Sequence, residues 1–184
     1  MDKHYLTPLF CPETIVVFGG HPGDPNSQTA HAKALHQYLL AQPFTGSLQF
    51  LDIHTAGTLA DLAHAKADLA IIALPAGEVA LALELAGRMC CRAALIISSG
   101  IDAQAAADLK KIARRENVLL LGPNCLGFQR PHLQLNASVA GPLSQSGSLA
   151  LVSQSGALTA SMLDWSSKNA VGFSSVVSLG PNTT

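Results

Sequence analysis

The sequence predicts an α/β fold built on a doubly wound, Rossmann-like parallel sheet. Short apolar runs rich in β-branched residues alternate along the chain with helical patterns, and the connections between them are short. The runs are continuously apolar, as expected for strands that helices cover on both faces. Parallel strands joined by right-handed crossover helices satisfy both observations.

The part of the chain up to Gly122 divides into strands and helices in alternation. The predicted strands are Thr14–Gly19, Leu48–Ile53, Asp68–Leu74, Ala93–Ser98 and Val118–Gly122. The predicted helices run from an N-cap at Ser27 to about Gln42, over Glu78–Met89 and over Asp102–Glu116.

The last two of these helices differ in pattern. Glu78–Met89 is apolar nearly all round, which predicts burial on more than one side. Asp102–Glu116 is amphipathic, with basic residues on its outer face. The residues expected to face inward are Ala105, Leu109, Ile112 and Ala113.

The pattern lapses from Pro123 to about Ser146, where we expect a long loop, and then restarts. A strand at Ser148–Ser153, a helix at Ala157–Lys168 and a strand at Gly172–Leu179 follow. A βαβ unit of ~40 residues is too small to fold alone. We therefore expect a first domain at residues 1–142 and the incomplete beginning of a second at 143–184, so that the sequence is a fragment.

Composition excludes several classes of function. The net charge of −1 gives no electrostatic basis for binding nucleic acid. Charged residues make up 12%, about half the usual ~25%, which predicts that a partner covers part of the surface, a homo-oligomer being one option. The apolar stretches are too short to span a membrane, and the N-terminus lacks a signal pattern.

The cysteines and histidines do not form a recognisable metal or disulfide pattern. The four cysteines have neither disulfide-framework nor Cys-x-x-Cys spacing, which favours a reducing, cytoplasmic location. The seven histidines lack ligand spacing, and we expect most of them on the surface or in loops. We therefore predict no metal site.

Ligands of doubly wound sheets bind at the carboxyl ends of the strands. This rule selects the loops that follow Gly19, Leu74, Ser98 and Gly122. Glycines in the first of these loops allow the backbone to approach a phosphate, but their spacing is not Gly-x-Gly-x-x-Gly. Asp24 would repel a phosphate, so a plain strand-to-helix turn is the alternative.

Two later motifs carry polar groups at strand ends. Residues 122–127, Gly-Pro-Asn-Cys-Leu-Gly, form a rigid turn in which Cys125 is either a nucleophile or a structural cysteine. No His or Asp stands at a spacing that pairs with it, which favours the structural role. Ser155 is not at a hydrolase elbow, because Ser153 stands where that motif needs glycine. The helix beginning at Ser155-Gly156 is instead an anion-site candidate.

These motifs together resemble the NDP-forming acyl-CoA synthetase superfamily. The C-terminal strings are L-L-G-P-N-C-L-G-F at 120–128, L-N-A-S at 135–138, A-L-V-S-Q-S-G-A-L at 150–158, L-D-W at 163–165 and G-F-S-S-V-V-S-L-G at 172–180. The N-terminal strings are P-L-F-C-P-E-T-I-V-V-F-G at 8–19, P-A-G-E-V at 75–79 and I-I-S-S-G at 96–100. The superfamily includes the α subunit of succinyl-CoA synthetase, ADP-forming acetyl-CoA synthetases and Pat-type protein lysine acetyltransferases.

The resemblance implies a CoA-binding Rossmann-like domain followed by the truncated start of a flavodoxin-like α/β domain. It implies coenzyme A or an acyl-CoA as ligand, with ATP or ADP bound only on modules absent from this sequence. The expected partners are the remaining domains of the same chain or a separate ATP-grasp subunit. We expect no catalytic residue within the 184 residues, and no activity of the fragment alone.

The resemblance also assigns site residues to the four loops and to the second unit. The residues expected to hold CoA phosphates are Gly19, Gly20, Gly23, Ser27 and Gln28. The residues expected to line the adenine and pantetheine path are Pro75, Ala76, Ser98, Ser99 and Gly100. Asn124 and Cys125 are expected near the thiol end, and Ser155 and Gly156 at an anion site.

Two departures from the family pattern keep other functions open. The first loop has Gly-Gly-His where the family has Gly-Ala-Ser, and the lysine that often follows the second strand is missing. Asp52 at the end of that strand suits the ribose hydroxyls of NAD(P), so a nicotinamide-dinucleotide module is one alternative. A degenerate, non-catalytic interaction domain is the other.

Overall fold

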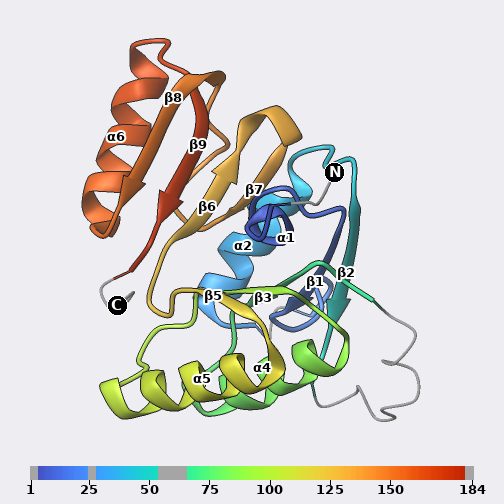
Figure 1. Ribbon diagram of the computed structural model, residues 1–184. Helices are drawn as coiled ribbons and strands as arrows, with labels where there is room; N and C mark the ends of the chain where they lie inside the picture. The colour runs from blue at the N-terminus through green and yellow to red at the C-terminus, as the bar shows by residue number, and fades with distance from the viewer. Residues whose placement is uncertain (1–3, 25–27, 54–65, 181–184) are drawn as a thin grey trace.

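A computed structural model describes residues 4–24, 28–53 and 66–180 (Figure 1). Its first sheet is parallel throughout and has the order β2-β1-β3-β4-β5. The strands are β1 (Thr14–Phe18), β2 (Ser47–Leu51), β3 (Leu69–Ile72), β4 (Ala93–Ile96) and β5 (Leu119–Leu121). The predicted doubly wound α/β sheet is confirmed. Its switch point lies between β1 and β3, where the strand order reverses.

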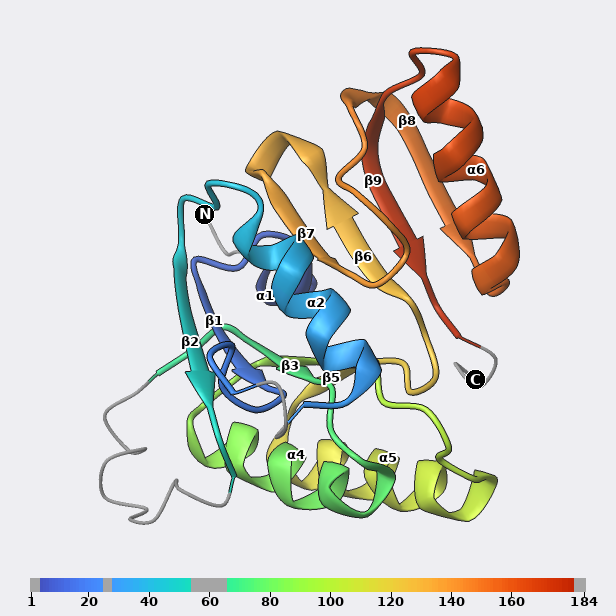
Figure 2. The same ribbon diagram turned by 180° about the vertical axis from the view of Figure 1, so that it is seen from behind.

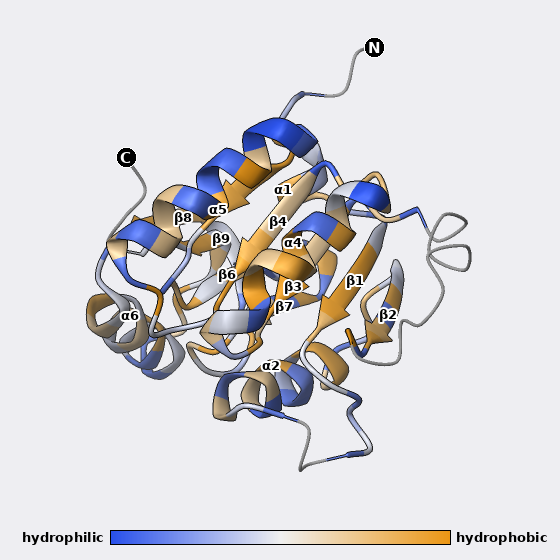
Figure 3. Cartoon of the chain, turned by 90° about the horizontal axis from the view of Figure 1, so that it is seen from below, coloured by the Kyte–Doolittle hydropathy of each residue, from blue (hydrophilic) through white to orange (hydrophobic). Residues whose placement is uncertain are grey.

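Helices cover both faces of this sheet (Figures 1 and 2). They are α1 (Thr7–Phe10), α2 (Ala30–Leu40), α4 (Val79–Arg88) and α5 (Ala103–Glu116). Alternate residues of β1 serve the two cores: Ile15 and Val17 pack on the α2 side, and Val16 and Phe18 on the α4 and α5 side. Figure 3 shows the resulting contrast between apolar strands and the polar outer face of α5. Within the described ranges, no helix is long and apolar enough to cross a membrane.

The N-cap of α2 differs from the prediction. Ser27 lies outside the described residues, and the helix is capped by Thr29, whose Oγ1 accepts from Ala32 N at 3.1 Å. The same hydroxyl donates to Ala73 O at 3.0 Å, at the end of β3. Thr29 therefore caps the helix and ties it to the residue that follows β3.

The predicted inward faces of two helices need correction. In α5, Ala105 is exposed, and Ala106 is the residue that packs inward with Leu109 and Ala113. In α4, Leu81 is 48% exposed, so the helix is not buried on more than one side. The burial of α4 predicted from its apolar residues is therefore greater than the burial in the structure.

A second, mixed sheet follows the first. It contains β6 (Gly127–Arg130), β7 (Leu135–Ser138), β8 (Ser146–Ser153) and β9 (Phe173–Ser178), with α6 (Gly156–Lys168) between the last two strands. Its order is β7-β6-β9-β8; β6 pairs antiparallel with β7 and β9, while β8 and β9 are parallel. The long loop expected over residues 123–146 is wrong, because β6 and β7 form a hairpin there.

The sequence pattern does not reveal the hairpin, because several buried positions in its strands are polar instead of apolar. Gln129, Asn136 and Ser138 are at most 1% exposed and bond to one another and to the loop that follows. The Gln129 side chain donates to Pro142 O at 3.0 Å and accepts from Ser144 N at 3.0 Å. This sheet takes strands from both sides of residue 142, and the division into domains at 1–142 and 143–184 stays a prediction.

A substitution at Gly127 tests how tightly the hairpin is built. Gly127 has φ +89°, and a Cβ there would collide with the carbonyl oxygen of Ala137. We expect Gly127→Ala to lower the free energy of unfolding by about 2 kcal/mol or more, measured by urea denaturation. Gly77→Ala is the control, because a Cβ at Gly77 meets nothing within 4 Å, and it should cost less than about 0.5 kcal/mol. Equal effects of the two substitutions would contradict this description.

Candidate functional site

The loops after β3, β4 and β5 are joined by hydrogen bonds at the carboxyl edge of the parallel sheet. Leu74 N donates to Ser98 Oγ at 2.9 Å, and Asn124 N donates to Ser98 O at 3.2 Å. The side-chain amide of Asn124 donates to Ile101 O at 3.3 Å. The structure therefore brings together three of the four loops predicted for ligand binding, with Ser98 buried at their centre.

The loop after β1 folds back on His21. Gly23 N donates to the imidazole Nδ1 of His21 at 3.0 Å, and the Gln28 side chain donates to His21 O. Gly20 has φ +74°, a conformation that favours glycine. Gly19 and Gly20 are buried, while Gly23 is exposed. The predicted phosphate residues that the structure describes thus form one compact turn before α2.

The predicted adenine and pantetheine residues border a small hollow. A cavity of about 200 Å³ lies between α4 and α5, lined by Ala76, Ala80, Ile101, Ala105, Asp108 and Leu109. Ala76 begins the short helix η2 (Ala76–Glu78), and Pro75 precedes it. Both residues are exposed, as are Ser99 and Gly100. This hollow is mostly apolar and opens beside two of the predicted loops.

Cys125 lies beneath its loop instead of on the loop surface. Its side chain is 3% exposed, and its Sγ donates to Ile96 O at 3.5 Å. Burial raises the pKa of this thiol to about 11, so the thiolate is scarce at neutral pH. The geometry favours the structural role over the nucleophile. A contact between Cys125 and a ligand stays a prediction.

The second predicted anion site adjoins the same edge. Leu126 packs against Gly156, where a Cβ would stand 3.2 Å from the leucine side chain, and Leu126 N donates to Ser178 Oγ at 3.1 Å. Ser155 is the N-cap of α6, and its hydroxyl accepts from Leu158 N at 3.2 Å. The start of α6 therefore lies next to the Gly122–Leu126 turn.

The carboxyl edge carries acidic but no lysine or arginine side chains among its described loop residues, 19–24, 52–53, 74–78, 98–102 and 122–126. The acids are Asp24, Asp52, Glu78 and Asp102. Asp102 is committed to capping α5, since its carboxylate accepts from Ala105 N at 2.8 Å. An anionic ligand would therefore rely on backbone N–H groups and imidazoles.

His36 is a site feature that sequence reasoning missed. The sequence places it on a helix and predicts no burial for it, whereas in the structure it is 4% exposed on α2. Its Nε2 lies 3.4 Å from the position a Cβ on Gly19 would take, and its ring packs edge-on against Phe50. Burial, and next the charge of His21, lower its pKa. Its helical phase with Ala32, Leu35 and Leu39 is the signal that could have placed it inside.

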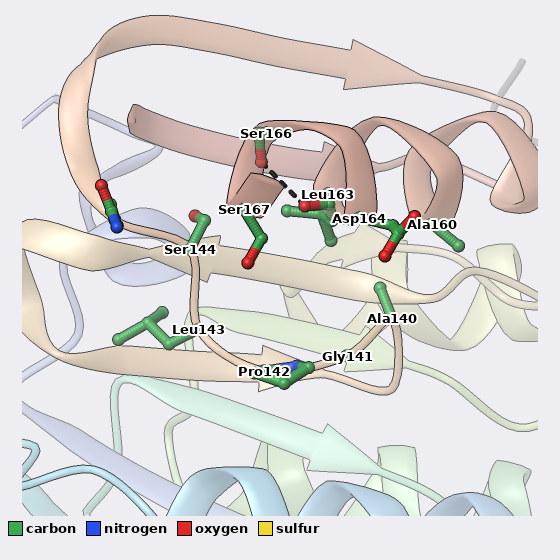
Figure 4. Close-up of a pocket in the computed structure, with 11 residues that line it drawn as sticks. Ala140, Gly141, Pro142, Leu143, Ser144, Ala160, Leu163, Asp164, Ser166 and Ser167 are labelled. Atoms are coloured by element: carbon green, nitrogen blue, oxygen red, sulfur yellow. Dashed lines mark hydrogen bonds between the residues drawn. The ribbon is translucent and has the colours of Figure 1, made fainter. Parts of the chain in front are cut away.

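A second cavity, of about 260 Å³, lies between α6 and residues 140–145 (Figure 4). Ser144 and Ser167 face it from opposite walls, and Leu163 and Ala160 supply apolar lining. Ser144 Oγ is buried and makes no hydrogen bond within the described residues. None of the predicted site residues lines this cavity. In the described ranges, no three His, Cys, Asp or Glu residues gather as metal ligands do.

The strand order and the loops gathered at one sheet edge define a doubly wound α/β protein, a class that binds ligands at this edge. A family model described as a CoA binding domain matches residues 14–131, and one described as a succinyl-CoA ligase like flavodoxin domain matches residues 146–184. The chain belongs to the CoA-binding domain family. The predicted resemblance to acyl-CoA synthetases is confirmed.

Curated relatives agree with this assignment. Acetate–CoA ligase (ADP-forming) I of Archaeoglobus fulgidus is 42% identical over 119 residues, covering 61% of this chain and 17% of that protein. The α subunit of acetate–CoA ligase (ADP-forming) I of Pyrococcus furiosus is 35% identical over 121 residues, covering 62% of this chain and 26% of that subunit. The CoA-binding region is therefore homologous to the α subunit of ADP-forming synthetases, although the chain spans only a minor part of these relatives.

Solved structures agree in fold. The dinucleotide forming acetyl-coenzyme A synthetase 1 of Ca. Korarchaeum cryptofilum, in complex with phosphate and ADP, matches with a TM-score of 0.83 and 26% identity. The match covers 95% of this chain and 39% of that one. ATP citrate lyase of Methanothrix soehngenii matches with a TM-score of 0.67 and 17% identity, over 91% of this chain and 31% of the lyase chain. At that identity the match shows a shared fold and nothing more.

The buried imidazole makes stability depend on pH. An unfolded histidine has a pKa of about 6.5, and the pKa of folded His36 is lower. Between these values the unfolded state binds more protons, so the free energy of unfolding falls as pH falls through about 6.5. We expect His36→Phe to show a shallower fall between pH 7.5 and 5.5 in urea denaturation, and exposed His132→Gln to keep the wild-type slope. A wild-type slope in His36→Phe would contradict the assignment.

Thiol labelling tests the burial of Cys125. Cys11 and Cys90 are exposed, whereas Cys91 and Cys125 are buried. Burial raises the pKa of Cys91 to about 12 and that of Cys125 to about 11. We expect Cys11 and Cys90 to react with a disulfide reagent within minutes at pH 8, and the other two only after denaturation. Rapid labelling of Cys125, identified by mass spectrometry, would show that it faces solvent.

Proposed function

We propose that this chain binds coenzyme A or an acyl-CoA at the carboxyl edge of β1, β3, β4 and β5. The observation that carries the proposal is the match of the CoA-binding family model to residues 14–131, which contain the whole parallel sheet and its loops. Doubly wound sheets bind ligands at this edge. The convergence of the loops on Ser98 supports the same location.

Each part of CoA has a counterpart at this edge. The pyrophosphate lies against the Gly19–Gly23 turn and the N-terminus of α2, where backbone N–H groups and the helix dipole attract anions. The adenine and pantetheine run along exposed Pro75–Ala76 and Ser99–Gly100, beside the apolar hollow. The thiol end lies toward Asn124 and the start of α6, where Ser155-Gly156 offers a second anion position.

The larger protein to which this region is related is an acyl-CoA synthetase. The curated relatives reported above are CoA ligases, which supports the synthetase over the acetyltransferase branch. ATP or ADP binds on other modules, supplied by the same chain or by a separate subunit. The name of the Pyrococcus furiosus α subunit supports the second arrangement. The 184 residues alone bind CoA and do not form acyl-CoA; ATP-dependent formation of acetyl-CoA by the purified chain would contradict this.

Calorimetric titration with CoA tests the location of the site. Ala76→Glu places a charged side chain in the path proposed for the adenine and pantetheine, and we expect it to weaken CoA binding at least tenfold, ~1.4 kcal/mol. Ala41→Glu adds the same charge at the C-cap of α2, at the other end of that helix, and should leave the affinity near wild type. Equal losses in both variants, or no CoA binding by the wild type, would overturn the proposal.

A nicotinamide-dinucleotide module is a second candidate, favoured by one observation. Phe18 pairs with Leu51, so Gly19 and Asp52 leave β1 and β2 side by side. A carboxylate there can accept hydrogen bonds from adenosine ribose hydroxyls. NADH binding that falls in Asp52→Ala, with CoA silent in the same titration, would favour this candidate over the CoA module.

A further inference from the structure

His36 lies behind the loop in which the proposed CoA pyrophosphate sits. Its imidazole fills the space where a side chain on Gly19 would be, with Ala32 and Ala73 as the other neighbours. Within the described residues, neither ring nitrogen has a hydrogen-bond partner, although the ring is 4% exposed. A buried polar group without a partner is unusual and costs stability, which points to a role beyond packing.

The charges at the carboxyl edge of the sheet indicate that this role is to balance the negative charge of a ligand. CoA brings a doubly charged pyrophosphate to loops whose described residues include acids and no lysine or arginine. Imidazoles are the side chains of this region that can still supply a positive charge near neutral pH.

We propose that His36 is a further part of the binding site: it takes up a proton when an anionic nucleotide binds at the Gly19–Gly23 loop and becomes the buried counter-charge to the pyrophosphate. This inference rests on the proposed function. The proton comes from solvent, and it leaves again when the ligand dissociates.

The physical basis is the linkage between two charges. In the free protein, burial keeps His36 neutral, because the charged imidazole loses its hydration. An anion on the other side of Gly19 favours the charged form, and the buried surroundings of the ring screen the attraction less than bulk water would. By reciprocity, protonation of His36 favours the anion, so affinity rises as pH falls.

Among the described groups around the His36 ring, none that contacts it carries a negative charge that would favour its protonation, so the proposal assigns that effect to the ligand. Gly19, directly after β1, and Phe50 of β2 meet the ring and are uncharged. His21, in the loop, opposes protonation. The other titratable positions on these elements are His31, Lys33 and Tyr38 on α2, and Asp52 directly after β2.

The test is calorimetric titration with dephospho-CoA, which lacks the 3′-phosphate and has no group of its own that titrates between about pH 6 and 8. Titrations at pH 6.5 in two buffers of different ionisation enthalpy give the number of protons taken up. We expect uptake of a fraction of a proton and an affinity that falls about threefold to tenfold from pH 6 to pH 8. His36→Gln should abolish both, and His132→Gln, which removes an exposed histidine of the hairpin, should preserve both.

The possible outcomes separate this inference from the proposed function. Absence of any binding of CoA or dephospho-CoA overturns the CoA site itself. Binding without proton uptake leaves the site standing and overturns the role of His36. Uptake that persists in His36→Gln but disappears in His21→Gln or in His31→Gln assigns the proton to that histidine instead and overturns the role of His36. If His36→Gln does not fold, NMR titration of the wild-type imidazole decides, since the proposal requires its pKa to rise when dephospho-CoA is added.

Discussion

Ser98 ties together the three loops that follow the neighbouring strands β3, β4 and β5. Its buried hydroxyl accepts from Leu74 N, and its carbonyl accepts from Asn124 N. Backbone groups that leave a sheet away from water need other partners, and a serine just after the middle strand, β4, supplies one to each side. These hydrogen bonds fix the residues next to the exposed segments Pro75–Ala76 and Ser99–Gly100, and thereby position both segments at the sheet edge. Hydrogen bonds between backbone groups and the polar side chains of Ser98 and Asn124 set the shape of this part of the candidate site.

The second sheet contributes to the core of the first. Phe128 and Leu135 of the hairpin pack in the same apolar cluster as Leu35 of α2, and Val177 of β9 joins them. The hairpin therefore covers the α2 side of the molecule, and its polar residues form a separate network on the other side. Because Leu126 also packs on Gly156, the loop after β5 is fixed from both sheets. The two candidate anion positions, before α2 and before α6, thus belong to one continuous packed structure.

The parallel sheet could be predicted from sequence because its strands are buried on both faces and therefore apolar without interruption. The loops of the site followed from the same prediction, since parallel topology alone sends them to one edge. The hairpin could not be predicted this way, because polar Gln129 and Asn136 occupy buried positions in its strands. Their side-chain amides donate to the carbonyl groups of Pro142 and Gly141, in the loop that follows. The helical phase of His36 could have predicted its burial, but its lack of a hydrogen-bond partner depends on neighbours distant in sequence, such as Phe50.

The helix N-termini at the carboxyl edge are not equivalent, and the difference divides the site by charge. The α5 N-terminus is already neutralised by the carboxylate of Asp102, whereas α2 and α6 are capped by the neutral hydroxyls of Thr29 and Ser155. An anion is therefore favoured before α2 and α6 and disfavoured before α5. The hollow between α4 and α5 is instead mostly apolar, with Ala76, Ile101 and Leu109 in its wall. An extended ligand with charged and apolar segments fits this layout better than a compact anion does. CoA has that division, and the buried imidazole behind the first loop stands where its most highly charged segment would lie.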